Sequence, residues 1–196
     1  LSARVGRVTS SRLKDVCDFL KSGKSSAARD GYLIEIVTER LTGQPVPHFT
    51  NSAMQHGTDN EPAARVEYAW SRQIEVEETG LWILEQRMFG GSPDGLVGKD
   101  GLIEIKCPYN STNHIEHLLL TSGQDLKDLA PEYFYQVHAN MLFTGRSKAY
   151  FISYDPRVIN HEHRLKTLVI EADPDIQIEL AERIQKAAEM MSEYLT

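Results

Sequence analysis

Cysteine, long apolar runs and positive charge are all scarce in this chain of 196 residues. Two cysteines, Cys17 and Cys107, are too few for a disulfide scaffold or a zinc site, so a reducing compartment fits. No apolar run approaches the roughly 18 residues of a membrane span. The first residues also lack the apolar stretch of a signal peptide. Because the first residue is Leu1, we expect the numbering to start within a longer chain.

The net charge of −7 argues against a protein that coats nucleic acid electrostatically. It does not exclude local contact with DNA, because basic residues gather near the N-terminus: Arg4, Arg7, Arg12, Lys14, Lys21, Lys24 and Arg29. The seven histidines show no metal-ligand spacing, and we interpret them as structural: His48, His56, His114, His117, His138, His161 and His163. The length and the 41% hydrophobic content predict one globular domain over residues 1–196.

Apolar spacing and capping residues predict an α/β fold. We expect helices at about 10–22 (capped by Thr9 or Ser10), 27–41, 58–72, 111–121, 131–143 and from 174 onward, with an irregular loop at 43–56. Pro62 is tolerated only in a first helical turn, which sets the expected start of the third helix. Strands are expected at about 81–87, 89–97, 101–107, 148–154 and 165–171. This order predicts a mixed central sheet of about five strands flanked by helices.

One segment, Ser92-Pro-Asp-Gly-Leu-Val-Gly-Lys-Asp-Gly-Leu-Ile-Glu-Ile-Lys106, carries most of the functional signal. Its glycine-rich turn between two apolar runs predicts a β-hairpin. If the hairpin is symmetric about Lys99, Asp94 lies opposite Glu104, and Lys106 shares the face of Glu104. Like charges opposed in a sheet are destabilising, and a divalent cation between the acids is the simplest reason to keep them. A surface hairpin with ordinary charges is the alternative.

Two carboxylates suit Mg²⁺, which takes oxygen ligands and keeps several waters, and Mn²⁺ can substitute for it. Lys106 would help to orient or deprotonate the attacking water and would ease charge at a phosphate. This is the chemistry of phosphodiester hydrolysis. The pattern Pro93-Asp94…Glu104-Ile105-Lys106 resembles the PD-(D/E)xK nuclease signature, which implies a restriction-endonuclease-like core.

Further motifs, in the same order along the chain, are similar to the λ-type exonucleases of phage recombination systems, within the YqaJ-like viral recombinase group. They are Arg4-Val-Gly-Arg-Val-Thr-Ser-Ser11, Gly57-Thr-Asp-Asn-Glu61-Pro62, Ser92-Pro-Asp-Gly95, Glu104-Ile-Lys-Cys-Pro108, Gln136 and Tyr154-Asp-Pro-Arg157. The resemblance spans nearly the whole chain. It implies a processive 5′→3′ exonuclease that degrades one strand of linear double-stranded DNA to mononucleotides and leaves a 3′ single-stranded tail.

The resemblance also implies a homotrimer that encloses DNA, which would reconcile processive binding with a net charge of −7. It implies a single-strand annealing recombinase as partner, and the cytoplasm of a phage-infected or prophage-carrying bacterium as location. Two other functions stay open, a structure- or sequence-specific PD-(D/E)xK endonuclease and a catalytically inactive DNA-end-binding module. A pocket for a terminal phosphate would argue against the endonuclease, and intact Asp94, Glu104 and Lys106 argue against the inactive module.

The resemblance assigns roles to individual residues. Asp94, Glu104 and the backbone carbonyl of Ile105 would bind the metal, with Glu61 as a further ligand, and Gln136 would lie near the metal and the scissile phosphate. Arg4 and Ser11 would receive the 5′-terminal phosphate, since an Arg fork and a hydroxyl at a helix start suit a dianion. Met54 would be an apolar wedge between terminal base pairs.

A structural alternative stays open for each of these assignments. Glu61 would serve only the helix dipole as a first-turn acid, and Ser11 would only cap its helix. Arg4 would be a frayed terminal charge, Gln136 a buried amide that satisfies backbone groups, and Met54 a core residue. Asp155 and Pro156 are expected to set a turn and to have no chemical role.

Overall fold

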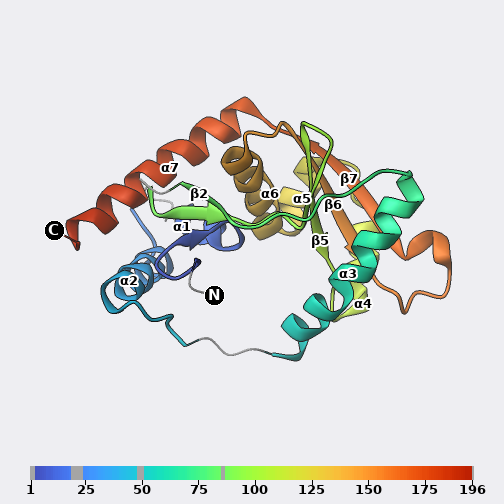
Figure 1. Ribbon diagram of the computed structural model, residues 1–196, viewed down its shortest axis with the longest axis horizontal. Coiled ribbons are helices and arrows are strands. Elements are labelled where there is room, and N and C mark those ends of the chain that lie inside the picture. Colours follow the sequence, from blue (N-terminus) through green and yellow to red (C-terminus); the bar gives the residue numbers. More distant parts are fainter. Residues whose placement is uncertain (1–2, 19–23, 48–50, 85–86, 196) are drawn as a thin grey trace.

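The computed structural model describes residues 3–18, 24–47, 51–84 and 87–195. In these ranges helices surround two β-sheets, one of four strands and one of three (Figure 1). The α/β class predicted from the sequence is confirmed, with the strands divided between two sheets instead of gathered in one. Among the described helices, none has the length and apolar character that crossing a membrane requires.

The larger sheet has the strand order β4-β5-β6-β7. Its strands are β4 (Gly95–Val97), β5 (Gly101–Lys106), β6 (Lys148–Tyr154) and β7 (Leu165–Glu171). β5 and β6 are parallel, and the other two pairs are antiparallel. A parallel pair needs a crossover connection, and three helices provide it: α4 (Ser111–Leu118), α5 (Gly123–Leu129) and α6 (Pro131–Thr144).

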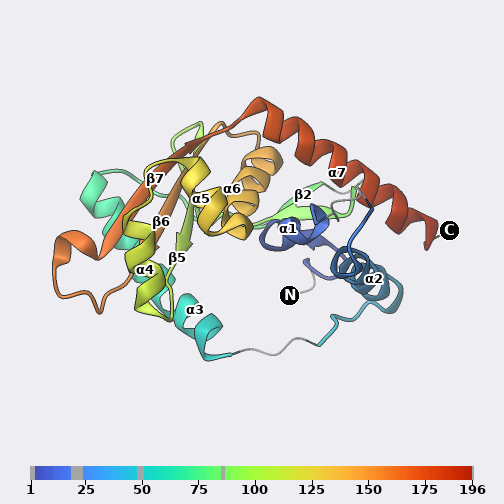
Figure 2. The ribbon, with the colours of Figure 1, turned by 180° about the vertical axis from the view of Figure 1, so that it is seen from behind.

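Alternate residues of the larger sheet face different helices. Leu102 and Phe151 pack with α5 and α6 in one apolar core, whereas Ile103 and Ile152 pack with α3 (Ser52–Arg72) in another. Seen from behind, α4 and α5 lie in front of β5–β7 (Figure 2). The sheet is therefore a middle layer, and even-numbered residues of β5 face the α4–α6 layer.

The smaller sheet has the order β1-β3-β2 and consists of β1 (Val8–Thr9), β2 (Trp82–Leu84) and β3 (Phe89–Gly91). It shares an apolar core with three helices: α1 (Leu13–Val16), α2 (Ala27–Thr42) and α7 (Pro174–Glu193). Helix α6 also contributes Ala139 and Phe143 to this core. Because α6 packs in two cores, it fixes the N-terminal segment relative to β5.

The longest regular patterns were predicted well. The strands at 148–154 and 165–171 are confirmed to the residue, and the expected helices at 27–41, 131–143 and from 174 onward match α2, α6 and α7. The helix expected at 111–121 ends earlier, at Leu118, as α4.

Other boundaries predicted from the sequence are wrong. The first helix ends at Val16 and follows a 3-10 turn, η1 (Ser10–Arg12), with no side-chain cap. Residues 19–22 of that prediction lie outside the described residues, as does His48. The strand expected at 89–97 is split at Pro93 into β3 and β4. Helix α5 was missed, although Ser122 and Asp125 form a capping box at its start.

Helix α3 begins at Ser52, inside the expected loop, because the Asn51 side chain accepts a hydrogen bond from the Met54 N–H and caps it. Pro62 consequently lies in the helix interior. Proline has no N–H, so the carbonyl of Thr58 receives no helical hydrogen bond from it. The cap at Asn51 is the stronger signal for the helix start.

Candidate active site

The β4–β5 hairpin sets the geometry of the site. Gly95 pairs with Ile103 and Val97 with Gly101, so the register continues to place Asp94 opposite Glu104, as the sequence predicted. The turn needs Gly98, whose φ of +55° is unfavourable for other residues. Arg146 donates to the carbonyls of Gly98 and Gly101 at 2.9 and 2.6 Å and thereby holds the turn.

Glu104 is the buried centre of the site, with 1% of its surface exposed. Its Oε1 accepts from the ammonium of Lys106 at 2.8 Å and from the amide of Gln136 at 2.5 Å. Its Oε2 accepts from the Asn140 amide at 2.9 Å. Lys106 also donates to the amide oxygen of Gln136 at 2.9 Å, so the three side chains form a closed ring of hydrogen bonds. Gln136 thus contacts charged side chains, not backbone groups, and the buried-amide alternative is wrong.

Helix α6 approaches Glu104 closely because β3 ends in glycine. A Cβ atom at Gly91 would lie 2.4 Å from Oδ1 of Asn140 and 3.1 Å from Oγ of Ser10. Both distances are shorter than a van der Waals contact, so a side chain there would push α6 and η1 apart. Gly91 therefore lets α6 and the N-terminal segment approach the same point.

Asp94 lies beside Glu104 at the end of the ladder. Its Oδ2 accepts from the backbone N–H of Ile105 at 2.6 Å, and its carbonyl accepts from Arg65 at 2.9 Å. Within one residue of a ladder, N–H and C=O point to the same neighbouring strand. The carbonyl of Ile105 therefore points toward Asp94, beyond the end of β4, where a metal ligand is expected.

The two acids carry more negative charge than their surroundings compensate. Burial and the nearby charge of Glu104 raise the pKa of Asp94 well above its ordinary value. Burial also raises the pKa of Glu104, and Lys106 offsets this only in part. Burial lowers the pKa of Lys106, but Glu104 and Asp94 outweigh it, so the net shift is upward and the amine stays an ammonium. Such a set of charges favours a bound cation.

The donors suit a hard divalent ion. The described residues contain no group of three or more His, Cys, Asp or Glu side chains placed to hold a metal, so a cation here would rest on Asp94, Glu104 and the Ile105 carbonyl. Glu104 Oε2 has one hydrogen-bond donor and a second lone pair. Mg²⁺ is often held by one or two carboxylates with waters in its other positions. The residues present therefore fit Mg²⁺ or Mn²⁺.

Glu61 lines the same cavity from α3. One of its oxygens accepts from Arg65 at 2.5 Å, one helical turn on, and the other oxygen is available to a water or a metal. Because α3 begins at Ser52, Glu61 is not in the first turn. The alternative of a first-turn acid that serves the helix dipole is therefore wrong, while the metal-ligand role remains a prediction.

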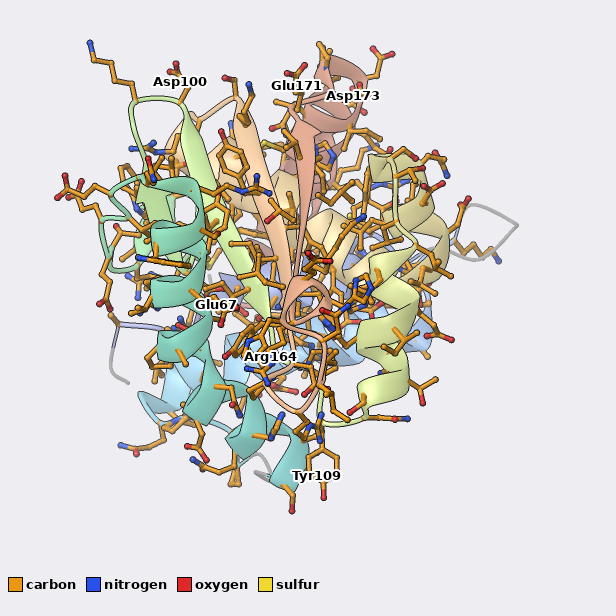
Figure 3. All side chains as sticks on the ribbon, turned by 90° about the vertical axis from the view of Figure 1, so that its right-hand side faces the viewer. Glu67, Asp100, Tyr109, Arg164, Glu171 and Asp173 are labelled. Carbon is orange, nitrogen blue, oxygen red and sulfur yellow. The ribbon has the colours of Figure 1, made fainter. Side chains whose placement is uncertain are left out.

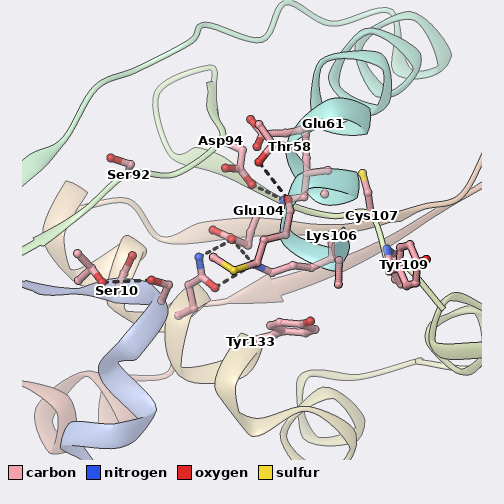
Figure 4. A pocket seen from close by; sticks show the side chains of 18 of the residues that line it. Ser10, Thr58, Glu61, Ser92, Asp94, Glu104, Lys106, Cys107, Tyr109 and Tyr133 are labelled. Atoms are coloured by element: carbon pink, nitrogen blue, oxygen red, sulfur yellow. Dashed lines mark hydrogen bonds and ion pairs between the residues drawn. The ribbon is translucent and has the colours of Figure 1, made fainter. Parts of the chain in front are cut away.

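A cavity of about 690 Å³ brings all nine predicted site residues together. They come from four parts of the fold: the N-terminal segment, α3, the β4–β5 hairpin and α6. The nine are Arg4, Ser11, Met54, Glu61, Asp94, Glu104, Ile105, Lys106 and Gln136. Figure 4 shows Glu104 and Lys106 in the centre, with Ser10 toward one end and Tyr109 toward the other.

At the N-terminal end of the cavity, the residues predicted to contact DNA are exposed. Ser11 is exposed and its hydroxyl bonds that of Thr9 at 3.1 Å, so it is not a helix cap. Arg4 is exposed, and Met54 is 55% exposed, which contradicts the core alternative for Met54. A neighbouring cavity of about 510 Å³ shares these residues and is lined further by Arg7 and Arg12. The phosphate and wedge roles stay predictions.

Three further residues of the site were not found from the sequence. Asn140 lies one helical turn after Gln136, Arg65 one turn after Glu61, and Tyr133 lies under the Lys106 ammonium at 4.7 Å from the ring centre. Spacing on the helix surface was the available signal for each. Asn140 and Tyr133 contact Glu104 and Lys106, and Arg65 also bonds the carbonyl of Asp94; these partners lie in other parts of the chain, which spacing does not reveal.

Comparison with known proteins places this geometry in a family context. Residues 1–147 match the model of the YqaJ-like viral recombinase domain. An alkaline exonuclease (LHK-Exo) from Laribacter hongkongensis is similar with 37% identity and a TM-score of 0.82, over 99% of this chain and 93% of that one. Its complex with dAMP gives 36% identity and a TM-score of 0.81 over the same shares.

A phage-related exonuclease from Haemophilus somnus 129PT has a TM-score of 0.79 over 96% of this chain and 95% of that one. At 17% identity this likeness supports the fold alone. No curated protein sequence matches this chain closely enough to count as a relative.

Proposed function

The chain belongs to the YqaJ-like viral recombinase family, and from this premise we propose that it is a Mg²⁺-dependent exonuclease that degrades one strand of linear double-stranded DNA from its 5′ end. The observation that carries the proposal is the shared cavity. It joins an acid pair with an adjacent ammonium to an arginine and a serine at a separate end. The first set suits hydrolysis of a phosphodiester, and the second suits a terminal phosphate.

Each side chain has a role in this proposal. Asp94, Glu104 and the Ile105 carbonyl would hold Mg²⁺, which when bound polarises the phosphate and activates water. Lys106 would orient the attacking water and neutralise charge at the scissile phosphate, and its bonds to Glu104 and Gln136 hold the ammonium in place. The Glu104 carboxylate would keep Lys106 protonated until the water approaches.

The distance between the two ends of the cavity would determine the product. With a 5′-phosphate held by Arg4 and Ser11 and the next phosphate at the acids, each cut would release one mononucleotide. The exonuclease names of the similar structures support this proposal over an endonuclease, and the dAMP complex shows a mononucleotide bound to one of those proteins. A 3′ single-stranded tail would remain.

Other parts of the proposal concern assembly. We propose a homotrimer that encloses the DNA, processive degradation, and an annealing recombinase as the partner that receives the 3′ strand in a bacterial cytoplasm. Light scattering tests the trimer directly, because the mass of the monomer is 22.2 kDa.

The decisive assay compares linear duplexes with 5′-phosphate, 5′-hydroxyl or blocked ends against a covalently closed circle. The proposal predicts Mg²⁺-dependent release of acid-soluble nucleotides from linear DNA, fastest with a 5′-phosphate, and no cutting of the circle. Nicking of the circle would instead support the endonuclease. Release that proceeds from the 3′ end would contradict the proposed polarity.

Lys106→Ala tests the catalytic assignment, with Lys99→Ala at the exposed hairpin turn as its matched control. The Lys106 variant should bind DNA ends and barely cleave them. The Lys99 variant should behave as the unmodified protein. Normal turnover by Lys106→Ala would overturn the role given to this amine.

A further inference from the structure

Tyr109 is a large aromatic side chain in an unusual position. It follows β5, three residues after Lys106, lines the cavity of the candidate active site and is 55% exposed. Tyr32, Tyr68 and Tyr154 are buried in the cores. An aromatic ring left exposed beside a proposed nucleic-acid site calls for a partner with a flat apolar face.

The backbone that carries Tyr109 is fixed by an ion pair between the exposed Arg157 and the buried Asp155. Arg157 donates to the carbonyls of Pro108 and Tyr109 at 2.9 Å each. The same guanidinium bonds both oxygens of the fully buried Asp155, at 2.8 and 2.9 Å. Asp155 and Arg157 therefore form a clamp, which goes beyond the turn expected from the sequence.

The ionisation of the Asp155 carboxyl agrees with this clamp. Burial alone would raise the pKa of its carboxyl, but hydrogen bonds from Arg157 and Ser111 lower it to about 2. The carboxylate therefore stays ionised at any working pH and keeps Arg157 in place.

The ring of Tyr109 contacts one other ring among the described residues. It makes an edge contact with His56 of α3, at 5.7 Å between ring centres, and Asn60 bonds the carbonyl of His56 at 2.8 Å. The next residue, Asn110, caps α4 with its side chain. The ring is thus held at a fixed place while much of its surface stays open to solvent.

Tyr109 lies at the end of the cavity opposite to the N-terminal segment. In Figure 4, Glu104 and Lys106 lie between Ser10 and Tyr109. Figure 3 shows Tyr109 and Asp100 at opposite ends of the larger sheet, so β5 leads from its turn toward Tyr109. A strand with its 5′-phosphate at Ser11 and its scissile phosphate at Glu104 would continue toward this ring.

We propose that Tyr109 is a base-stacking residue that binds the second nucleotide of the degraded strand, on the 3′ side of the scissile bond. This inference rests on the proposed 5′→3′ exonuclease function. Stacking of a base on an aromatic side chain contributes about 1–3 kcal/mol and tolerates any base, as an enzyme that removes every nucleotide requires. After each cut the stacked nucleotide is the new 5′ end, so the strand stays bound while it advances.

Photocrosslinking tests the position of the base. A 5′-phosphorylated duplex carries 5-iododeoxyuridine at nucleotide 1, 2 or 8, and is bound in Mg²⁺ to the full chain with Lys106→Ala to prevent cleavage. The proposal predicts a crosslink to Tyr109 from nucleotide 2 alone, identified by mass spectrometry. A crosslink to Tyr109 from nucleotide 1 or 8, or none from nucleotide 2, would overturn it.

Affinity tests the role of the ring. In the same background Tyr109→Ala should weaken binding of the DNA end about 5- to 150-fold, the equivalent of one lost stack. Tyr109→Phe keeps the ring and should bind as the parent does. Tyr194→Ala removes a ring that is 54% exposed at the end of α7 and should change nothing. Unchanged affinity in Tyr109→Ala, or equal loss in Tyr109→Phe, would contradict stacking.

A double-mutant cycle tests the clamp. Arg157→Ala should weaken end binding in the parent but add little in the Tyr109→Ala protein, because both changes remove the same stack. Fully additive losses would refute the positioning role of Arg157. Failure of the underlying function is distinguishable, since it would appear as absence of 5′ nucleotide release by the unmodified protein, whatever residue stands at 109.

Discussion

Two polar clusters lie on one face of the larger sheet, on neighbouring strands. Lys106 of β5 is paired in register with Ser153 of β6, so both side chains face the α4–α6 layer. The acid cluster consists of Asp94, Glu104 and Lys106. The histidine cluster consists of Ser153, His114 and His117, all buried. Tyr133 separates them, with Lys106 over its face and the edge of His117 against it.

In the histidine cluster the polar side chains are joined in one chain of hydrogen bonds. Nε2 of His114 lies 2.8 Å from the carbonyl of His163, which can only accept, so Nε2 carries the proton. Nδ1 of His114 and Nδ1 of His117 each lie 2.8 Å from the hydroxyl of Ser153, which can donate to one ring and accept from the other. Burial lowers the pKa of His117 to about 4, which keeps the ring of His117 neutral near pH 7.

The acid cluster is different because its charges do not balance. Two carboxylates face one ammonium, the pKa values of both acids are raised, and the Oδ1 atom of Asn140 is buried without a hydrogen-bond partner. The histidine cluster is closed by α4, whereas the acid cluster opens into a cavity. The comparison teaches that uncompensated charge beside a cavity indicates a functional site, whereas buried polar groups alone do not.

The largest expected effect is the loss of activity on Asp94→Asn. Removing a metal ligand should lower the rate of nucleotide release roughly a thousandfold or more, equivalent to several kcal/mol of transition-state stabilisation. The amide oxygen can still accept from Ile105, and repulsion with Glu104 is removed. Melting in EDTA should therefore show an equal or higher stability than in the unmodified protein.

Asp100→Asn makes the same chemical change at the exposed hairpin turn and is the control. It should keep full activity. A marked loss of metal-free stability in Asp94→Asn would mean that the acid pair is structural, and the contrast between the clusters would fail.

Ser153→Ala should have the opposite profile. It leaves two buried imidazole nitrogens without a partner, at a cost of roughly 1–3 kcal/mol each. The free energy of unfolding should fall by about 2–6 kcal/mol, measured by denaturant titration, while activity per folded molecule stays within about twofold. Ser147→Ala, at an exposed serine before β6, should change neither. Loss of activity without loss of stability in Ser153→Ala would make the histidine cluster part of the catalytic machinery.

The histidines also predict how stability depends on pH. Burial lowers the pKa of His117 and of His138 to about 4 each, from 6.5. Both groups bind protons more readily in the unfolded chain, so their contribution is complete above pH 6.5 and is lost as pH falls toward 4. A shift of this size is equivalent to at most about 3 kcal/mol per group.

Melting curves between pH 7.5 and 4 check this dependence. His138→Gln should flatten the profile, whereas His161→Gln, at an exposed position, should leave it unchanged. An equally steep profile in His138→Gln would show that His138 does not carry the shift.

The smallest expected effect is stabilisation by metal. Mg²⁺ at about 100 times its dissociation constant should add about 2.7 kcal/mol to the free energy of unfolding of the unmodified protein, and less at lower concentration. The increase should vanish in Asp94→Asn and persist in Ser153→Ala. An increase that survives Asp94→Asn would place the ion elsewhere.

Local patterns predicted the parts of the molecule that local forces determine. The hairpin register follows from alternation and a glycine turn, so the opposition of Asp94 and Glu104 was predictable. Strands β6 and β7 were predictable from their apolar runs. The start of α3 was missed because one asparagine cap counts for more than the position of Pro62.

The rest of the site depends on contacts between distant segments. Asn140 contacts Glu104 because Gly91 allows α6 to approach β3. Arg157, which follows β6, bonds the carbonyl of Tyr109, which follows the neighbouring strand β5. Neither contact leaves a spacing pattern in the sequence. The motifs thus supplied the reacting groups, and tertiary packing supplied the groups that hold them.

The measurement that tests the central claim most directly is the anomalous scattering of Mn²⁺ in crystals of the protein. The account predicts one peak or a close pair of peaks about 2.0–2.6 Å from oxygens of Asp94, Glu104 and Ile105, and none in Asp94→Asn crystals. An active protein whose Mn²⁺ binds away from these oxygens, with Asp94 and Glu104 contacting only protein groups, would contradict it.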